Sequence, residues 1–155
     1  MGAQRALGSR HREPAELDVI LTSLIDKLAR RLRGAHRVCR TVTLRLRFHD
    51  FTRATRSHTM PAPTAGTAII LPVARLLLAA SLPMIADRGI TLLGASLSNL
   101  DNDEPLQLTL PFDDMTPPIL DSALDAVRDK FGSKSITRAG LLGHDPGIDM
   151  PMLPD

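Results

Sequence analysis

Residues 37–50 alternate between polar and apolar side chains, and this two-residue period constrains the fold more than any other feature of the chain. Side chains of a β-strand point to opposite faces in turn, so the period predicts a strand with one buried and one exposed face. Residues 51–60 follow almost at once, which predicts an antiparallel hairpin with a tight connection near His49 and Asp50. The buried face of the first strand would carry Val42, Leu44, Leu46 and Phe48, and its exposed face Thr41, Thr43, Arg45, Arg47 and His49.

A helix is expected on either side of this hairpin. Residues 14–33 have apolar side chains three and four positions apart, the period of a helix that buries one side. A second helix is expected over 67–88, capped by Thr64 or Thr67. Two internal prolines would make this second helix start late, kink or divide.

Short strands at 2–8 and 90–100 complete the order β-α-β-β-α-β. This order predicts an α+β domain, with a four-stranded sheet and both helices on one face. The other face would be open and would carry the arginines of the first hairpin strand. Further on, residues 119–131 have the period of a short helix, and residues 135–143 are predicted to be either a short strand or irregular.

The net charge of +2 conceals a strong asymmetry along the chain. Residues 1–60 carry thirteen Lys or Arg against five Asp or Glu, whereas residues 61–155 carry six against twelve. A basic half that contains strands favours a polyanionic partner, although a solvated charged face is the commoner origin of such clusters. The chain has no Trp or Tyr and only four Phe, so it has few aromatic rings on which single-stranded bases could stack.

Residues 68–86 form the longest apolar stretch, which is nearly long enough to cross a bilayer. Arg75 lies near its centre, and a central Arg is costly to insert into a membrane. The stretch is therefore predicted to be a buried amphipathic helix, with no membrane partner. A single cysteine excludes an internal disulfide, which fits a cytoplasmic protein.

Residues for catalysis or metal binding are poorly supplied. The sequence has no Gly-rich phosphate loop, no zinc-type His/Cys spacing and no nucleophile elbow. Acidic groups at 101–104 and 113–114 lie in polar segments that are more typical of solvated linkers than of a two-metal site. By alternation Cys39 shares a face with Thr41; its basic sequence neighbours make a lowered thiol pKa conceivable, but an inert thiol is favoured. No catalytic residue and no metal ligand is predicted.

Cations and hydroxyl groups are concentrated in the hairpin. Guanidinium groups make charge-assisted, often bidentate bonds to phosphate, and hydroxyl groups add short positioning contacts. We therefore expect salt-dependent binding to a nucleic-acid backbone, and give equal weight to a solvated face that binds nothing. Alternation puts Arg56 and His58 on one face without showing which face is exposed. The cationic candidates are Arg40, Arg45, Arg47, Arg53, Arg56 and His58.

The segments RTVTLRLRFHDFTRATRSHT (40–59), GITLLGASLSNLD (89–101) and QLTLPF (107–112) resemble the C-terminal little-finger domain of Y-family DNA polymerases. The likeness is greatest to the polymerase IV branch of actinobacterial type. The segment ALDAVRDKFGSKSITRA (123–139) resembles a C-terminal extension of many bacterial members. The resemblance implies a little-finger DNA-binding domain at 1–103, a linker with a clamp-binding motif at 104–118, an extension at 119–143 and a disordered tail at 144–155.

In that family the open face of the sheet lies along the DNA major groove and contacts phosphates of both strands. The resemblance implies primer-template DNA as a partner. It also implies that Arg56 and His58 of the TRSH motif face the DNA and are the leading candidates for DNA contact. The DNA-contact role transfers to Arg45, Arg47, Arg53, Arg56 and His58, with Arg40 as a sixth candidate.

The hexapeptide at 107–112 matches the family's motif for binding the bacterial sliding clamp, an extended peptide that docks in an apolar cleft. Leu110 and Phe112 would be the buried anchors, and Gln107 would supply directional hydrogen bonds. Pro111 would limit the entropy lost on binding. An edge strand is the alternative, because apolar residues alternate from Leu106 onward. The matching residues are Gln107, Leu108, Leu110, Pro111 and Phe112.

The palm, fingers and thumb of a polymerase have no counterpart in the sequence, so the resemblance places magnesium only in that missing catalytic core. The chain itself is expected to hold no cofactor and to catalyse no phosphoryl transfer by the family's route. Its expected function is DNA binding and clamp tethering in an error-prone translesion polymerase, with the remainder of that polymerase as a further partner. Rival hypotheses are a protein-interaction module whose basic face does not bind DNA, and an enzyme of unrecognised chemistry.

Overall fold

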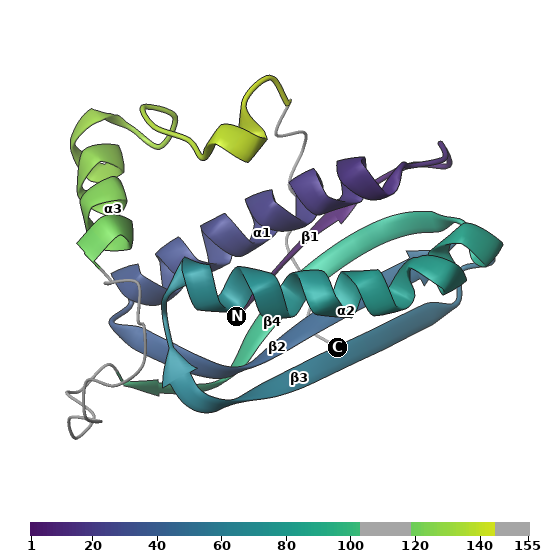
Figure 1. The fold of residues 1–155 in the computed structure, drawn as a ribbon, viewed down its shortest axis with the longest axis horizontal. Helices are drawn as coiled ribbons and strands as arrows, with labels where there is room; N and C mark the ends of the chain where they lie inside the picture. The colour runs from purple at the N-terminus through teal and green to yellow at the C-terminus, as the bar shows by residue number, and fades with distance from the viewer. Residues whose placement is uncertain (103–118, 145–155) are drawn as a thin grey trace.

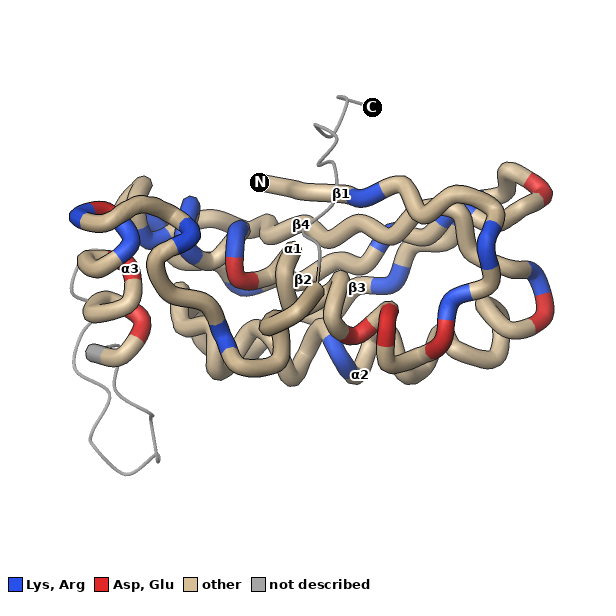
Figure 2. Tube along the Cα trace, turned by 90° about the horizontal axis from the view of Figure 1, so that it is seen from above, with Lys and Arg blue, Asp and Glu red and all other residues tan. Residues whose placement is uncertain are grey.

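The computed structural model describes residues 1–102 and 119–144. Four strands form one sheet, and the two long helices cover one of its faces (Figures 1 and 2). The predicted α+β order β-α-β-β-α-β is confirmed. The elements are β1 (Gly2–Ala6), α1 (Pro14–Gly34), β2 (Arg37–Phe48), β3 (Arg53–Thr64), α2 (Thr67–Arg88), β4 (Ile90–Asn102), α3 (Ile119–Phe131) and the 3-10 turn η1 (Ala139–Leu141).

Strand β2 has a neighbour on both sides, in the sheet order β1-β4-β2-β3 with all neighbours antiparallel. Leu44 pairs with Ala95 of β4, and Leu46 pairs with Leu93. These pairs give the centre of the sheet one apolar side, which packs against the apolar sides of both long helices. The four alternating β2 residues predicted to be buried are all in the core: Val42, Leu44, Leu46 and Phe48.

Strand β3 runs to Thr64, beyond the segment 51–60 that was predicted as the second strand of the hairpin. It lies at the edge of the sheet, where a proline removes no hydrogen bond to a second neighbour. Pro61 and Pro63 are therefore tolerated within it. The segment 135–143 forms no strand and contains only the short turn η1.

Helix α2 is continuous, and it is apolar on both sides rather than amphipathic as predicted. One side lies in the core, but Leu76 on the other side is 71% exposed. By length and composition α2 would suffice to cross a membrane, with a mean hydropathy of 2.1, although a core helix meets the same criteria. Arg75 donates to both carboxylate oxygens of Asp18 on α1, at 2.7 and 2.8 Å, and so joins the two long helices.

The N-terminus of α2 is capped by Asp121 of α3, and not by Thr64 or Thr67 as predicted. The Thr67 amide donates to Asp121 Oδ2 at 2.8 Å. A carboxylate in this position accepts from an otherwise unpaired amide and interacts favourably with the helix dipole. The Thr67 hydroxyl instead accepts from Arg33 Nη1 at 3.1 Å, and the Thr64 hydroxyl accepts from the Gly66 amide.

Helix α3 and the segment after it dock on α1 through ion pairs between largely buried groups. Asp26 of α1 accepts from Arg128 and Arg138, at 2.9 and 3.0 Å. Arg33 of α1 pairs with Asp125 at 2.6 Å. Removing one member of a buried ion pair leaves the other charge uncompensated, which costs more than the intact pair contributes. The docking of α3 therefore depends on each of these groups.

Asp121→Ala should lower the free energy of unfolding by about 2 kcal/mol, because it removes a helix cap and one of the two carboxylates with which Arg33 and Arg138 each pair. Asp129→Ala is the control, since its carboxylate is 72% exposed and pairs with Arg30 at the surface. The control should change the stability by less than about 0.5 kcal/mol. Urea denaturation measures both values. Equal losses in the two variants would contradict the role assigned to Asp121.

Candidate nucleic-acid interface

The sheet surface away from the long helices, which we call the helix-free face, carries three arginines. Arg45 pairs with Thr55 of β3 and with Gly94 of β4, and Arg47 pairs with Arg53. Directly paired residues share a face, and this face is opposite to that of Leu44 and Leu46. The prediction that Arg45 and Arg47 lie there is confirmed. The register adds the polar residues Gln4, Thr43, Thr55, Ser57 and Ser96 to the same face.

The three arginines differ in how firmly they are held. Arg47 donates from Nε to the Thr91 hydroxyl at 3.3 Å and is half-buried, whereas Arg53 is exposed. Next to half-buried Arg45, a Cβ on Gly94 would lie 3.1 Å from Cβ of Gln4. Glycine inside a strand often marks a point where a ligand approaches the backbone closely. The face thus carries one guanidinium group that is held by a hydrogen bond and one that is exposed, and Gly94 leaves its centre without a side chain.

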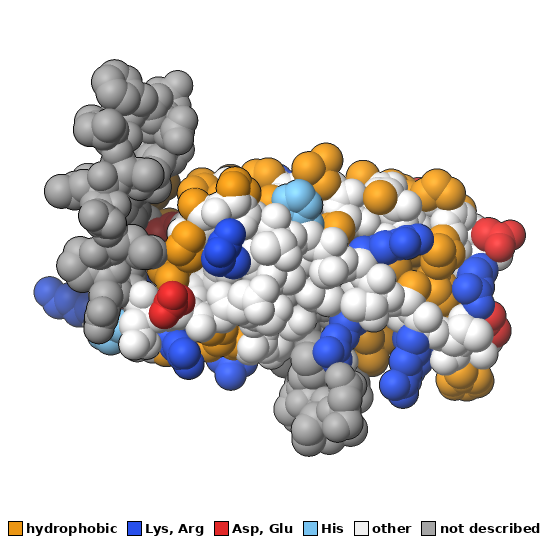
Figure 3. Space-filling view, turned by 90° about the horizontal axis from the view of Figure 1, so that it is seen from below, with side chains coloured by type: hydrophobic (Ala, Val, Ile, Leu, Met, Phe, Trp, Pro, Cys, Tyr) orange, Lys and Arg blue, Asp and Glu red, His pale blue; other side chains and the backbone are white. Residues whose placement is uncertain are grey.

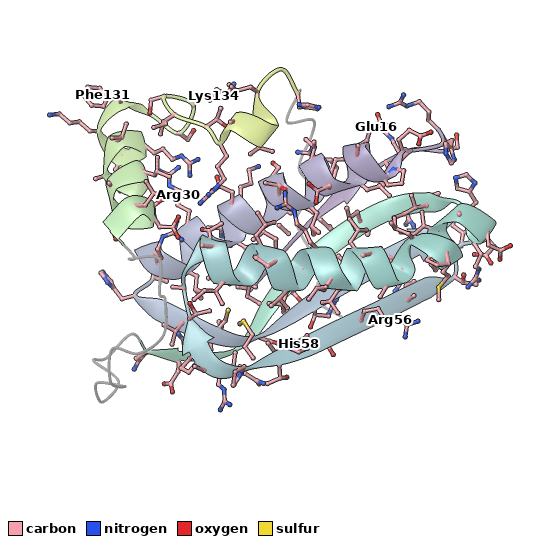
Figure 4. The ribbon with its side chains drawn as sticks, viewed as in Figure 1. Glu16, Arg30, Arg56, His58, Phe131 and Lys134 are labelled. Atoms are coloured by element: carbon pink, nitrogen blue, oxygen red, sulfur yellow. The ribbon has the colours of Figure 1, made fainter. Side chains whose placement is uncertain are left out.

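Arg56 and His58 lie on the other side of β3. They pair with Leu44 and Val42, whose side chains are in the core, so they share the helix side of the sheet. Both are exposed, because β3 is the edge strand, and Figure 4 shows them along that edge. The implication of the resemblance that Arg56 and His58 lie on the open face of the sheet is therefore wrong. Their contact with DNA stays a prediction.

The β3 edge separates two kinds of surface. Figure 3 looks onto this edge and shows a mostly polar surface with scattered Lys and Arg side chains. Hydrophobic side chains gather along the rim on the α2 side.

Arg40 and Cys39 lie at the far end of the hairpin, where the β2–β3 pairing is irregular. Arg40 Nη2 donates to the Pro61 carbonyl at 3.0 Å, so Arg40 helps to hold this end of β3. Cys39 is fully buried in the core, away from the face that alternation predicted for it. Burial raises the pKa of its thiol to about 11, which supports the favoured interpretation of an inert thiol and contradicts the lowered pKa that its basic neighbours made conceivable.

The predicted tight connection near His49 and Asp50 is confirmed by a bond from the Phe51 amide to the Phe48 carbonyl at 3.0 Å. The Asp50 carboxylate accepts from the amide and the hydroxyl of Thr52, and from Arg88 at 2.6 Å. The Arg88 guanidinium also lies 4.7 Å from the centre of the Phe48 ring. The hydrogen bonds from Thr52, and then those from Arg88, lower the pKa of Asp50 to about 2.

The helix-free face carries groups that match phosphate chemically. Guanidinium and hydroxyl groups match phosphate oxygens. Among residues 1–102 and 119–144, no group of three or more His, Cys, Asp or Glu is arranged to hold a metal ion. The predicted clamp motif, residues 107–112, lies outside the described residues.

Sequence reasoning missed the contributions of the outer strands to this face. Gln4 of β1 and Ser96 of β4 join it through their pairing with Gly94 and Thr43. The alternation of serine with leucine at the end of β4 was a usable signal for Ser96. Nothing in the five residues of β1 could have indicated Gln4.

Known proteins identify the family. Residues 1–110 match the impB/mucB/samB family C-terminal domain, and the chain belongs to this family. It is 35% identical over 154 residues to DNA polymerase IV 2 of Mesorhizobium japonicum, with 87% of this chain and 36% of the relative aligned. It is 41% identical over 100 residues to DNA polymerase IV of Halorhodospira halophila, with 64% and 28% aligned. The chain thus spans about a third of the length of these relatives.

Solved structures support the fold. The little finger domain of PolIV, in complex with the beta-clamp processivity factor, superposes with a TM-score of 0.50 at 24% identity, covering 72% of this chain and 97% of that domain. A post-insertion binary complex of Dbh DNA polymerase superposes with a TM-score of 0.56 at 16% identity, covering 63% and 28%. The resemblance to the polymerase IV little finger is confirmed, and its actinobacterial type stays a prediction.

The lowered pKa of Asp50 predicts how the stability of the hairpin end depends on pH. A carboxylate whose pKa is lower in the folded than in the unfolded state stabilises the fold above about pH 4, and this stabilisation is lost as the pH falls toward 2. Asp50→Asn should therefore lower the melting temperature at pH 6, and the difference from the wild type should shrink below pH 4. Thermal unfolding followed by circular dichroism measures this.

Asp87→Asn, at the exposed end of α2, is the control for a lost surface charge. If the difference in melting temperature between Asp50→Asn and the wild type stays constant from pH 6 to pH 3, the lowered pKa of Asp50 is contradicted.

Proposed function

We propose that this chain is the DNA-binding and sliding-clamp-tethering part of an error-prone translesion DNA polymerase, and that catalysis takes place in a core outside it. The observation that carries the proposal is the helix-free face, with Arg45, Arg47 and Arg53 on one side of the sheet of a family whose relatives are DNA polymerase IV. Magnesium would bind in that core, and the protein would work in the cytoplasm.

The chemistry of the face favours contact with the DNA backbone over reading of bases. Guanidinium groups bind phosphate oxygens, and the neighbouring hydroxyl groups of Thr43, Thr55 and Ser57 add short contacts. A polymerase that copies damaged templates gains from binding that does not depend on base identity. Such binding is mainly electrostatic, so its affinity falls steeply as salt is added.

Arg56 and His58 would contact the same duplex only where it bends around the β3 edge, because they lie on the other side of β3 from Arg45. Arg40 would have to give up its bond to Pro61 to reach phosphate. The three arginines of the helix-free face are therefore the primary contacts in this proposal, and the other three candidates are secondary.

Clamp binding is supported by the match of residues 107–112 to the family's motif and by the relative that is in complex with the beta-clamp processivity factor. A short peptide that holds the polymerase at the clamp raises its local concentration at the primer end, with no need for high affinity for DNA. The two activities would then act together: the peptide would recruit the polymerase to the clamp, and the sheet would position it on the DNA.

The variant Arg45→Ala/Arg47→Ala/Arg53→Ala should bind primer-template DNA more weakly and with less salt dependence. Each lost phosphate contact reduces the slope of log K against log salt by about 1, so the slope should fall by about 2 to 3. The control Arg10→Ala/Arg31→Ala/Lys130→Ala removes three exposed cations away from the sheet and should keep the slope. Fluorescence anisotropy from 50 to 300 mM NaCl measures it.

The same titration tests the rival hypothesis of a protein-interaction module. Absence of binding at 50 mM salt would favour a protein-interaction module whose basic face does not bind DNA. Equal losses in both triple variants would show that the helix-free face is not the particular site of DNA contact. A matched variant, Arg56→Ala/His58→Ala, shows whether the duplex reaches the β3 edge. A smaller change in slope than for the triple variant is expected.

Leu110→Ala/Phe112→Ala should weaken binding to a bacterial sliding clamp at least about 30-fold, because buried anchor residues of this kind contribute 2 kcal/mol or more. Leu106→Ala is the control, since it continues the alternation but lies outside the hexapeptide. Surface plasmon resonance with immobilised clamp measures both. If Leu106→Ala loses as much affinity for the clamp as the double variant does, the segment acts as a strand and not as a docking peptide.

A further inference from the structure

Phe51, at the tip of the β2–β3 hairpin, is 78% exposed and has a left-handed backbone, with φ at 62°. The Phe48 amide donates to the Thr52 carbonyl at 3.0 Å, which closes a loop that runs from His49 to Phe51. In such short loops the last residue is left-handed, and glycine is usual there because it has no Cβ. A phenylalanine in this position strains the backbone and leaves an apolar ring in water. Neither the backbone conformation nor packing in the core therefore accounts for the ring.

The backbone that carries this ring is held firmly in place. The Asp50 carboxylate accepts from Arg88, at the end of α2, at 2.6 Å. A Cβ on Gly89 would lie only 2.7 Å from the His49 ring, so that ring packs closely over the glycine before β4. Strained residues that their surroundings hold in place are typical of functional positions. The tip thus presents the Phe51 ring at a fixed point.

The ring adjoins the cationic surface proposed to bind DNA. Arg53, two residues further along β3, is exposed, and it shares the helix-free face with Arg47, the residue that it pairs with. The neighbouring carboxylate of Asp50 pairs with Arg88, so its charge is compensated and repels phosphate little. A strand of DNA that follows these arginines toward the hairpin tip would meet Phe51 where the row of arginines ends.

We propose that Phe51 stacks on an unpaired nucleobase at the point where duplex DNA on the helix-free face passes into single strand. The proposal rests on the proposed function and adds a ring contact to the phosphate contacts. Bases inside a duplex are covered by their neighbours, whereas an unpaired base offers its face to an aromatic ring. Every base has such a face, so this contact also does not depend on base identity.

The test compares two DNAs with the full chain: a primer-template with a single-stranded template overhang, and a blunt duplex with the same number of phosphates. Phe51→Ala should weaken binding to the primer-template by about 5-fold or more, because stacking of one base on an aromatic ring contributes at least this much. Its affinity for the blunt duplex should be unchanged. The salt dependence should also stay the same, because no phosphate contact is lost. Fluorescence anisotropy from 50 to 300 mM NaCl measures all three.

Phe131→Ala is the matched control, since it removes a ring that is 67% exposed on α3, at the opposite end of the molecule from the hairpin tip (Figure 1). It should leave both affinities unchanged. Phe51→Gly should bind as weakly as Phe51→Ala, but its melting temperature should rise by about 2 °C, because glycine adopts the left-handed conformation without strain. A lower melting temperature would show that the ring serves the fold, and would overturn the proposal.

The proposal is also overturned if Phe51→Ala binds the primer-template as tightly as the wild type, if it loses as much affinity for the blunt duplex, or if Phe131→Ala loses as much affinity. When the triple variant of Arg45, Arg47 and Arg53 loses affinity and Phe51→Ala does not, the stacking contact alone fails. When the wild type binds neither DNA, the proposed DNA-binding function fails together with it.

Discussion

The register of β2 with its two neighbours is the constraint on which both the core and the cationic face depend. Leu44 pairs with Ala95 on one side and Arg56 on the other, and Arg45 pairs with Gly94 and Thr55. A shift by one residue would turn Leu44 to solvent and put a guanidinium group into the core. Burial of the leucines therefore fixes where the arginines point, and the face needs no separate stabilisation.

This constraint explains what could be predicted from the sequence. In a strand with one apolar side, the alternation shows which side chains are buried and which are exposed. The existence of β2, the tight connection after it and the side on which Arg45 and Arg47 lie were therefore predictable. Strand β3 has polar side chains on both sides around Arg56 and His58, so only its pairing shows which way they point. The side of Cys39 was missed for a related reason, because irregular pairing between Cys39 and Thr41 interrupts the alternation.

Long-range polar contacts were beyond sequence reasoning altogether. Asp121 caps a helix whose first residue is 54 positions away in the sequence, and Arg138 reaches Asp26 across 112 positions. Single charges carry no periodic signal, so no pattern joins them before the chain is folded. Sequence periodicity did predict α3 as a helix, but not that its acidic residues would dock on the basic end of α1.

The docking of α3 on α1 reduces the positive charge that the basic half of the chain offers to a partner. The basic half of the chain suggested a polyanionic partner, yet part of its charge is compensated internally by acidic residues of the second half. Arg30 and Arg33 pair with Asp129 and Asp125 of α3. Internal pairs of this kind contribute to the fold and not to a field that attracts DNA.

The positive charge that remains for a partner is therefore smaller than the composition suggests, and it is confined to particular surfaces. Among the described residues, one such surface is the helix-free face with the adjoining β3 edge. A net charge of +8 spread over sixty residues would bind any polyanion weakly and in many orientations. In the proposed function, three arginines on one side of the sheet bind a duplex in a defined orientation, because the strands that carry them are fixed by the buried leucines between them.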